Sequence, residues 1–281
     1  YVDWKRSVDI FRQHGIASRL IRSVEFDDQE SIHVIAAWHP FISGKHHKVP
    51  EIDSTNAEML RGNYSDGDSL VATIQTDGRG RHGNHWQDHS DSFKGSWMLN
   101  AKHLLHITPL KQLKVAQEIR SALCFEQEHQ QNMLTKWPND LLLRCQQELQ
   151  WRKVGGILFQ SFSKGDEQRM VIGIGINTKK RELQPGQGSL DEIGIHVNAS
   201  ELFPILNAVI ASIFEKKHTI LERVSDDNID LKSVLSDCIY RNETYALQSI
   251  NPQKIIITNR RGQTFEIDDD DQISWKNLHP Q

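Results

Sequence analysis

A cluster of glycine and arginine residues in the first half of the chain, Gly78-Arg79-Gly80-Arg81-His82-Gly83, constrains the fold more than any other feature. Glycine lets the backbone turn freely and lie close to a ligand, and the planar guanidinium group of arginine matches phosphate or carboxylate oxygens. The cluster follows an apolar run at residues 70–74, which predicts a buried strand. The sequence therefore predicts an anion-binding loop at a strand end, beside a cleft. A solvated turn and a nucleic-acid contact are the alternatives.

Charge and cysteine usage argue against several classes of protein. The 281 residues carry 33 Lys and Arg against 37 Asp and Glu, a formal net charge of -4. Because DNA binding depends on neutralising phosphates, this balance argues against DNA as a partner. The three cysteines, Cys124, Cys145 and Cys238, lack C-x-x-C spacing, which argues against disulfides or thiolate zinc and favours a cytoplasmic location. No apolar run reaches about 18 residues, so we expect no membrane segment.

Hydrophobic periodicity predicts an α+β fold in three parts. Residues 1–49 are expected to form an N-terminal extension, residues 50–240 the main domain and residues 241–281 a small β domain, with a polar junction at 43–48. Because the sequence does not begin with methionine, we expect an upstream segment to have been removed.

Apolar spacing also predicts the individual elements. The predicted helices span residues 7–24, 57–60, 109–130, 199–224 and 231–240. The predicted strands span residues 31–38, 70–74, 95–101, 134–143 with a bend at Pro138, 153–160 and 169–177, followed by several strands within 245–275.

Further polar segments accompany the glycine and arginine loop. The segment Asp53-Ser54-Thr55-Asn56 precedes it, and Lys136-Trp137-Pro138-Asn139-Asp140, Lys153-Val154-Gly155-Gly156-Ile157-Leu158 and Gly173-Ile174-Gly175-Ile176-Asn177 follow it. With Trp86 ending the loop as G-R-G-R-x-G-(R/N)-x-W, these segments resemble the signature of biotin protein ligases across about residues 50–180. The resemblance implies a class II synthetase-like mixed β-sheet flanked by helices, with a small C-terminal β-barrel-like domain. The C-terminal tail is shorter than usual in the family and lacks its glycine-rich run.

The resemblance also implies a reaction. Biotin protein ligases use ATP to form biotinyl-5'-AMP and then transfer biotin to a lysine of the biotin carboxyl carrier domain of a carboxylase. The implied small molecules are ATP, Mg²⁺ and biotin as substrate, and the implied partners are the carrier domain and, in a homodimer, a second copy of the chain. Basic side chains are needed because the reaction brings two anions together.

The matching positions fall into groups by implied role. The catalytic residues are expected to be Lys153, Arg79 and Arg81. Biotin is expected to contact Ser54, Thr55, Gln75, Gly78, Arg79, Lys153, Gly155, Gly156, Gly173 and Gly175. ATP is expected to contact Arg79, Arg81, Trp86, Lys136, Asn139, Asp140 and Asn177, with Asp140 also holding Mg²⁺. An apolar trough for the biotin arm is expected from Ile157, Ile174, Ile176 and Trp137.

Several of these residues also have a purely structural interpretation. Ser54 and Thr55 suit a helix cap, and Asp140 suits an Asx cap at the bend. Lys153 is the strongest catalytic candidate, and a solvated position beside a hairpin is its less favoured alternative. Cys124 lies in a predicted helix and is expected to be a core residue rather than a reactive one.

Two other binding roles are disfavoured. His82, His85 and His89 have a spacing that suggests zinc, but they lie in a glycine-rich loop without a helix-borne carboxylate. Many bacterial biotin ligases are repressors through an N-terminal winged helix. Residues 1–49 leave room for about half of such a domain and show no basic recognition helix.

Two rival functions remain open. Lipoate ligases and octanoyl transferases share the fold, but their arginine motif reads R-R-x-x-G-G-G and they lack the K-W-P-N-D block. A catalytically silent relative that binds biotin or regulates is the second rival. The joint retention of Arg79, Arg81, Asp140 and Lys153 argues against it, because an inactive site needs none of them.

Overall fold

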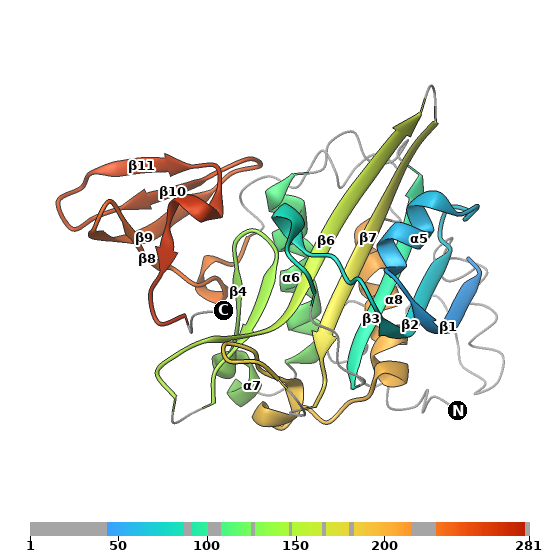
Figure 1. The fold of residues 1–281 in the computed structure, drawn as a ribbon. Helices are drawn as coiled ribbons and strands as arrows, with labels where there is room; N and C mark the ends of the chain where they lie inside the picture. The colour runs from blue at the N-terminus through green and yellow to red at the C-terminus, as the bar shows by residue number, and fades with distance from the viewer. Residues whose placement is uncertain are drawn as a thin grey trace, which may run out of the picture.

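The computed structural model describes residues 44–86, 91–100, 108–124, 127–145, 148–164, 167–179, 183–214 and 229–278. The predicted helix at 7–24, the predicted strand at 31–38 and His89 lie outside these residues. Figure 1 shows a large sheet with helices packed on it and a smaller C-terminal sheet beside strand β4.

The large sheet has seven strands in the order β1-β2-β3-β7-β6-β5-β4. These strands are β1 (His46–Ile52), β2 (Ser69–Gln75), β3 (Ser92–Asn100), β4 (Met133–Lys136), β5 (Asp140–Leu143), β6 (Arg152–Lys164) and β7 (Glu167–Asn177). Strand β1 is parallel to β2, and all other neighbours in this sheet are antiparallel. The predicted mixed sheet of an α+β fold is therefore confirmed.

Alternation along β7 separates a packed face from a face that carries polar groups. Ile172 and Ile174 belong to the main hydrophobic core together with helices α6 (Pro109–Leu123) and α8 (Ala199–Phe214). Because successive side chains of a strand point to opposite faces, Gly173 and Gly175 face the other way. The short helix α5 (Thr55–Arg61) covers part of that second face.

Helix α5 begins at a polar cap. Ser54 has extended backbone angles, and its Oγ accepts a hydrogen bond from the N–H of Ala57 (3.4 Å). A hydroxyl at this position satisfies one of the free N–H groups at a helix start. The capping interpretation of Ser54 is thus confirmed.

The predicted helix at 109–130 is wrong at its C-terminal end. Helix α6 ends at Leu123, where Cys124 takes a non-helical conformation, and a separate helix α7 (Gln127–Asn132) follows. Cys124 is buried in the main core, so its assignment as a core residue is confirmed. Helix α8 covers the described part of the predicted helix at 199–224, and none of the described helices is long and apolar enough to cross a membrane.

The predicted helix at 231–240 is also wrong. A single 3-10 turn spans Leu231–Ser233, and strand β8 spans Asp237–Tyr240. Cys238 is fully buried while Asp237 and Ile239 are exposed, which is the period of two of a strand. A short apolar run fits either period, and here pairing with the next strand decides the structure.

One strand was not predicted, and another begins earlier than its sequence suggests. Strand β1 starts at His46, inside the predicted polar junction, where His46 Nδ1 lies 2.7 Å from Ser69 Oγ. Polar residues are tolerated there because β1 is an edge strand with one side facing water. Strand β3 starts at Ser92, because Phe93 is drawn into the main core.

The C-terminal sheet is open rather than a closed barrel. Its order is β11-β10-β9-β8-β12, so β11 and β12 are its edges. Besides β8, its strands are β9 (Glu243–Ile250), β10 (Ile255–Thr258), β11 (Thr264–Ile267) and β12 (Ser274–Trp275). Its buried residues pack against Trp137 and Leu142 of the main domain. The sheet starts at β8, and the domain division at 240/241 stays a prediction.

Candidate active site

A cavity of about 620 Å³ lies on the polar face of the main sheet. It brings together segments 54–56, 75–86, 136–140 and 153–158 with segment 173–177, and the C-terminal residues 270–271 complete it. The predicted site residues that line it are Ser54, Thr55, Gln75, Arg79, Arg81, Trp86, Lys136, Asn139, Asp140, Lys153, Gly156, Gly173, Gly175 and Asn177. Most of the residues expected from the sequence therefore share one hollow.

Two predicted glycines lie beside the cavity without lining it. A Cβ atom on Gly78 would lie 2.8 Å from the carbonyl oxygen of Trp86, and a Cβ atom on Gly155 would lie 2.8 Å from that of Gly175. Both glycines thus allow two backbone segments to approach each other. Their expected contact with biotin stays a prediction, although their positions explain why a side chain is not tolerated.

The predicted apolar trough is only half present. Ile157 and Ile174 line the cavity. Ile176 belongs to the core beneath the sheet, and Trp137 packs in the second core, against the C-terminal sheet. The trough prediction is wrong for these two residues, because neither lines the cavity. Ile157 and Ile174 are themselves buried members of the main core, so they line the cavity from within the sheet.

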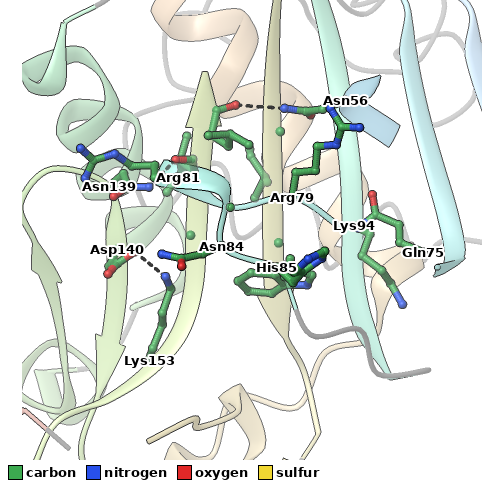
Figure 2. Close-up of a pocket in the computed structure, with 18 of the residues that line it drawn as sticks. Asn56, Gln75, Arg79, Arg81, Asn84, His85, Lys94, Asn139, Asp140 and Lys153 are labelled. Carbon is green, nitrogen blue, oxygen red and sulfur yellow. Dashed lines mark hydrogen bonds and ion pairs between the residues drawn. The ribbon is translucent and has the colours of Figure 1, made fainter. Parts of the chain in front are cut away.

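The glycine and arginine loop is a short hairpin. Gly80 N donates to Asn84 O (2.7 Å), and Trp86 N donates to Gly78 O (2.8 Å). Gly83 has φ +79°, and a Cβ atom there would meet no described atom within 4 Å, so its role is the left-handed turn itself. In the view of Figure 2 the loop crosses in front of β6 and β7.

The glycines of β7 make room for other side chains of the protein. A Cβ atom on Gly175 would lie 2.7 Å from the indole ring of Trp86, and one on Gly173 would overlap the carboxamide of Asn56. Trp86 therefore lies directly on the strand, and the loop is seated on the sheet through this indole. A glycine at each position is required for that close approach.

A buried polar network forms the end of the cavity near α5. Gln75 Oε1 accepts from Thr55 N (2.8 Å) and Thr55 Oγ1 (3.0 Å). Ser96 Oγ donates to Asn56 Oδ1 (2.5 Å), and Asn56 Nδ2 donates to Gln160 Oε1 (2.9 Å). Because their own bonds hold these amides and hydroxyls in place, they can present fixed donors and acceptors to a polar ring.

The opposite end of the cavity carries a chain of five charged groups. Asp140 Oδ1 lies 2.8 Å from Lys153 Nζ, and Asp140 Oδ2 lies 3.1 Å from Lys136 Nζ. Lys136 Nζ also lies 3.3 Å from Asp270, which in turn accepts from Arg81 Nη1 (2.7 Å). Figure 2 shows Lys153 pointing toward Asp140. Two strand-borne lysines and a loop arginine are thus joined through two carboxylates.

Burial and pairing fix the charge states within this chain. Burial raises the pKa of Asp140, but Lys153 and Lys136 outweigh it and hold that pKa well below the usual range. Burial lowers the pKa of Lys136, and Asp140 and Asp270 reverse this, so the net shift is upward. Asp140 is therefore ionised and Lys136 protonated at neutral pH.

The cavity attracts anions. Arg79 stands at its edge with 51% of its side chain exposed and only a 3.8 Å ion pair to Asp77. The basic residues lining the cavity are Arg79, Arg81, Lys94, Lys136 and Lys153, and the carboxylates are Asp140, Asp270 and Asp271. Basic groups are in excess although the whole chain is acidic, so the positive potential is local to this site.

Two places in and beside the cavity carry side chains that metals bind. Both oxygens of Asp140 lie against ammonium groups, so a Mg²⁺ ion there would have to displace a lysine, and the residues present do not fit it. The histidines considered for zinc separate, because His85 Nδ1 lies 3.3 Å from Asp77 while His82 approaches Asp269 and Asp271. His82 and Asp271 are exposed and Asp269 is half-buried, and exposed acidic groups are common without a metal ion.

Several lining residues were not singled out from the sequence, and three of them make polar contacts within the site. Asn56 stood inside a motif without a role of its own. Lys94 is buried, and its Nζ donates to Thr73 O (2.5 Å). Asp270 is 189 residues away from its partner Arg81. The acidic run at 268–271 was visible in the sequence, but no local rule connects it to the loop.

Residues 48–177 match the model of the Biotin/lipoate A/B protein ligase family. Over these residues the chain is similar to members of this family. The matched region contains every predicted site residue and the loop, whereas Asp270 lies outside it.

Family members with defined names extend the match. The chain is 31% identical over 210 residues to the bifunctional ligase/repressor BirA of Salmonella typhimurium, covering 71% of this chain and 61% of that protein. It is 32% identical over 168 residues to BirA of Escherichia coli, covering 56% of this chain and 50% of the relative. The chain thus spans between half and two thirds of the length of these curated relatives.

A solved structure of the family superposes on most of the chain. The biotin protein ligase from Aquifex aeolicus, in complex with biotin and ATP, matches with a TM-score of 0.62 and 25% identity. The match covers 83% of this chain and 99% of the Aquifex chain. The resemblance found in the sequence is therefore confirmed for family and fold.

Proposed function

We propose that this chain is an ATP-dependent biotin protein ligase. It joins the carboxylate of biotin to the α-phosphate of ATP, giving biotinyl-5'-AMP and pyrophosphate, and then transfers biotin to a lysine of a carrier domain. The observation that carries the proposal is that Arg79, Arg81 and Lys153 line a single cavity, which also holds a fixed polar network at its other end. The match to the family model and the likeness to the Aquifex enzyme support it.

In the first step a carboxylate oxygen of biotin attacks the α-phosphorus, and the bond to pyrophosphate breaks. Negative charge builds between the two reactants, and Lys153, held by Asp140, stabilises it. Arg79 and Arg81 neutralise the phosphates and reduce the repulsion between the two anions. The proposed reaction uses no metal ion at Asp140, because both of its oxygens are already paired with lysines.

In the second step the amine of the carrier lysine attacks the acyl carbon. The bond to AMP breaks, AMP leaves with the electron pair, and the amine loses a proton. Lys153 again faces the charge that develops on the acyl oxygen. The hairpin at 78–86 crosses the sheet in front of this junction, where it limits the access of water to the mixed anhydride.

The other residues are assigned roles according to the end of the cavity that they line. Thr55 and Gln75, with Ser54, face the ureido ring of biotin. Gly156 lies beneath the ring, and Gly173 and Gly175 line the same cavity beneath the side chains of Asn56 and Trp86. Trp86, Asn139 and Asn177 belong to the nucleotide end. The carrier domain and a second copy of this chain are the proposed partners, and ATP is proposed to arrive as its Mg²⁺ complex. The free cysteines accord with a reducing, cytoplasmic setting.

The test is a transfer assay with ATP, Mg²⁺, labelled biotin and a carboxylase carrier domain. We expect covalent label on one carrier lysine, loss of label with Lys153→Ala, and unchanged labelling with Lys254→Ala, a lysine on the C-terminal sheet that pairs with Glu266. Transfer of lipoate in preference to biotin would identify the lipoate-type rival. Binding of labelled biotin without transfer to several carriers would identify the silent relative.

A further inference from the structure

Asp270 bridges two basic groups that come from distant parts of the main domain. It opens the 3-10 turn Asp270–Gln272 between β11 and β12 of the C-terminal sheet. Its Oδ1 accepts from Arg81 Nη1 (2.7 Å) and its Oδ2 lies 3.3 Å from Lys136 Nζ. All three side chains are more than three-quarters buried. One carboxylate thus spans a loop arginine and a strand lysine inside the cavity.

Arg81 and Lys136 are also the pair expected to hold phosphate oxygens. A carboxylate offers two oxygens about as far apart as two oxygens of a phosphate, and guanidinium and ammonium groups bind either anion. Asp270 lines the same cavity as both partners. The two cations are therefore spaced for one bridging anion, and an anion from the protein itself already lies between them.

We infer that Asp270 is a resident substitute for a nucleotide phosphate, and that ATP or pyrophosphate displaces it from Arg81 and Lys136. The inference rests on the proposed function only in naming phosphate as the competing anion. When Asp270 is displaced, the turn at 270–272 loses its contact with the glycine and arginine loop. Binding of a nucleotide therefore changes how the C-terminal sheet is held against the site.

The charges explain why such a contact is both present and replaceable. Without Asp270, Arg81 and Lys136 would face each other as like charges across the cavity. A phosphate chain carries more negative charge than one carboxylate, so it satisfies the same two groups better. Because a competitor must first be displaced, Asp270 lowers the affinity for phosphate, and removing its charge raises it.

The test is calorimetric titration of the full chain with inorganic pyrophosphate, without biotin. Asp270→Asn should bind pyrophosphate at least about fivefold more tightly than the unaltered protein while melting at a lower temperature. Asp271→Asn is the matched control. Asp271 carries the same charge on the same turn and lines the cavity, but it forms no ion pair within the described residues. Asp270→Glu should restore the original affinity within about twofold.

If Asp270→Asn lowers the melting temperature but raises the affinity for pyrophosphate, Asp270 acts as a competing anion rather than as a purely structural contact. Equal tightening in Asp270→Asn and Asp271→Asn would reduce the effect to general charge and overturn the inference. Weaker pyrophosphate binding by Asp270→Asn, or no pyrophosphate binding by any of the proteins, would also overturn the inference. Because the titration needs neither biotin nor turnover, its outcome is separate from that of the transfer assay.

A second measurement uses only the unaltered chain. Ile273 N donates to Asp270 O (3.4 Å) and Gln272 N to Asp269 O (3.2 Å), so amide hydrogen exchange monitors the turn. Pyrophosphate should accelerate exchange at residues 270–273, because the side-chain anchor of the turn is lost. Slower exchange there would mean that the turn closes on the ligand, and the inference would be wrong.

Discussion

The two sides of the cavity hold their charges in different ways. On the strand side, Lys136, Asp140 and Lys153 are carried by neighbouring strands, and the side chain of Asp140 is only 6% exposed. On the loop side, Arg79 is half exposed and pairs weakly with Asp77. The strand side is thus fixed by backbone ladders and buried ion pairs, whereas the loop side depends on a hairpin held by one indole and by the ion pair of Arg81 with Asp270.

The strand side and the loop side of the cavity therefore suit different functions. Groups that stabilise a transition state must be held in place before the reaction, which favours rigid strands. Groups that admit and then enclose a substrate must be able to move, which favours a loop with few buried contacts. Changes on the strand side should therefore alter chemistry and stability, and changes on the loop side should alter ligand handling with little effect on stability.

Lys153→Ala should have the largest effect. Removing the group that faces the developing charge should slow formation of the biotinyl adenylate about 100- to 1,000-fold, whereas biotin affinity should fall much less. Single-turnover release of pyrophosphate, measured beside equilibrium biotin binding, separates the two. Comparable losses in both would reduce Lys153 to a ground-state contact and remove the functional distinction between the two sides.

Asp140→Asn should cost stability, on the order of 3 kcal/mol at pH 7, because it leaves two ammonium groups without their shared carboxylate. The pKa of Asp140 is lowered in the folded state, so its contribution is complete above the ordinary aspartate pKa of about 3.9 and is lost as the pH falls below it. Chemical denaturation at several pH values should therefore show the gap between the two proteins narrowing toward pH 3. A gap that widens on acidification would show that Asp140 is not held ionised by its lysines.

The sequence predicted the residues of the strand side, but not the partner of Arg81 on the loop side. Lys136, Asp140 and Lys153 lie in local motifs on regular strands, so spacing and resemblance placed them in one site. Asp270 could not be predicted, because its partner Arg81 is 189 residues away and only tertiary packing brings them together. Trp137 was misplaced since its motif gives its neighbours but not its direction, and it points into the second core.

The fold errors have a related cause. The predicted helix at 231–240 failed because an apolar run of this length fits a strand as well as a helix, and pairing of β8 with β9 decided it. Strand β1 was missed because an edge strand needs no apolar pattern on its open side. The local sequence predicted the helices and strands that bury an apolar face. It did not predict segments whose structure depends on which other strand lies beside them.

Gly175→Ala tests the point where the two sides meet. Its new Cβ atom would lie 2.7 Å from the ring of Trp86, so the indole must move and the loop loses its seat. We expect a stability loss of about 1 to 2 kcal/mol and faster proteolysis within residues 78–86. Gly156→Ala is the control, because Gly156 lies opposite Gly175 in the register and a Cβ atom there meets nothing closer than 3.4 Å. Equal proteolysis of the two variants would mean that Trp86 does not anchor the loop.

Arg79→Ala should have the smallest effect on stability, under about 0.5 kcal/mol, because its side chain is half exposed and its ion pair to Asp77 is long. Arg81→Ala should cost more, since Arg81 is 23% exposed and bonds directly to Asp270. Both variants should nevertheless release biotinyl adenylate faster than the unaltered protein, because each removes a cation that retains the mixed anhydride. Denaturation curves and the rate of adenylate release, measured on the same preparations, compare the two properties. If Arg79→Ala destabilised the fold as much as Asp140→Asn, the loop side would be as firmly held as the strand side.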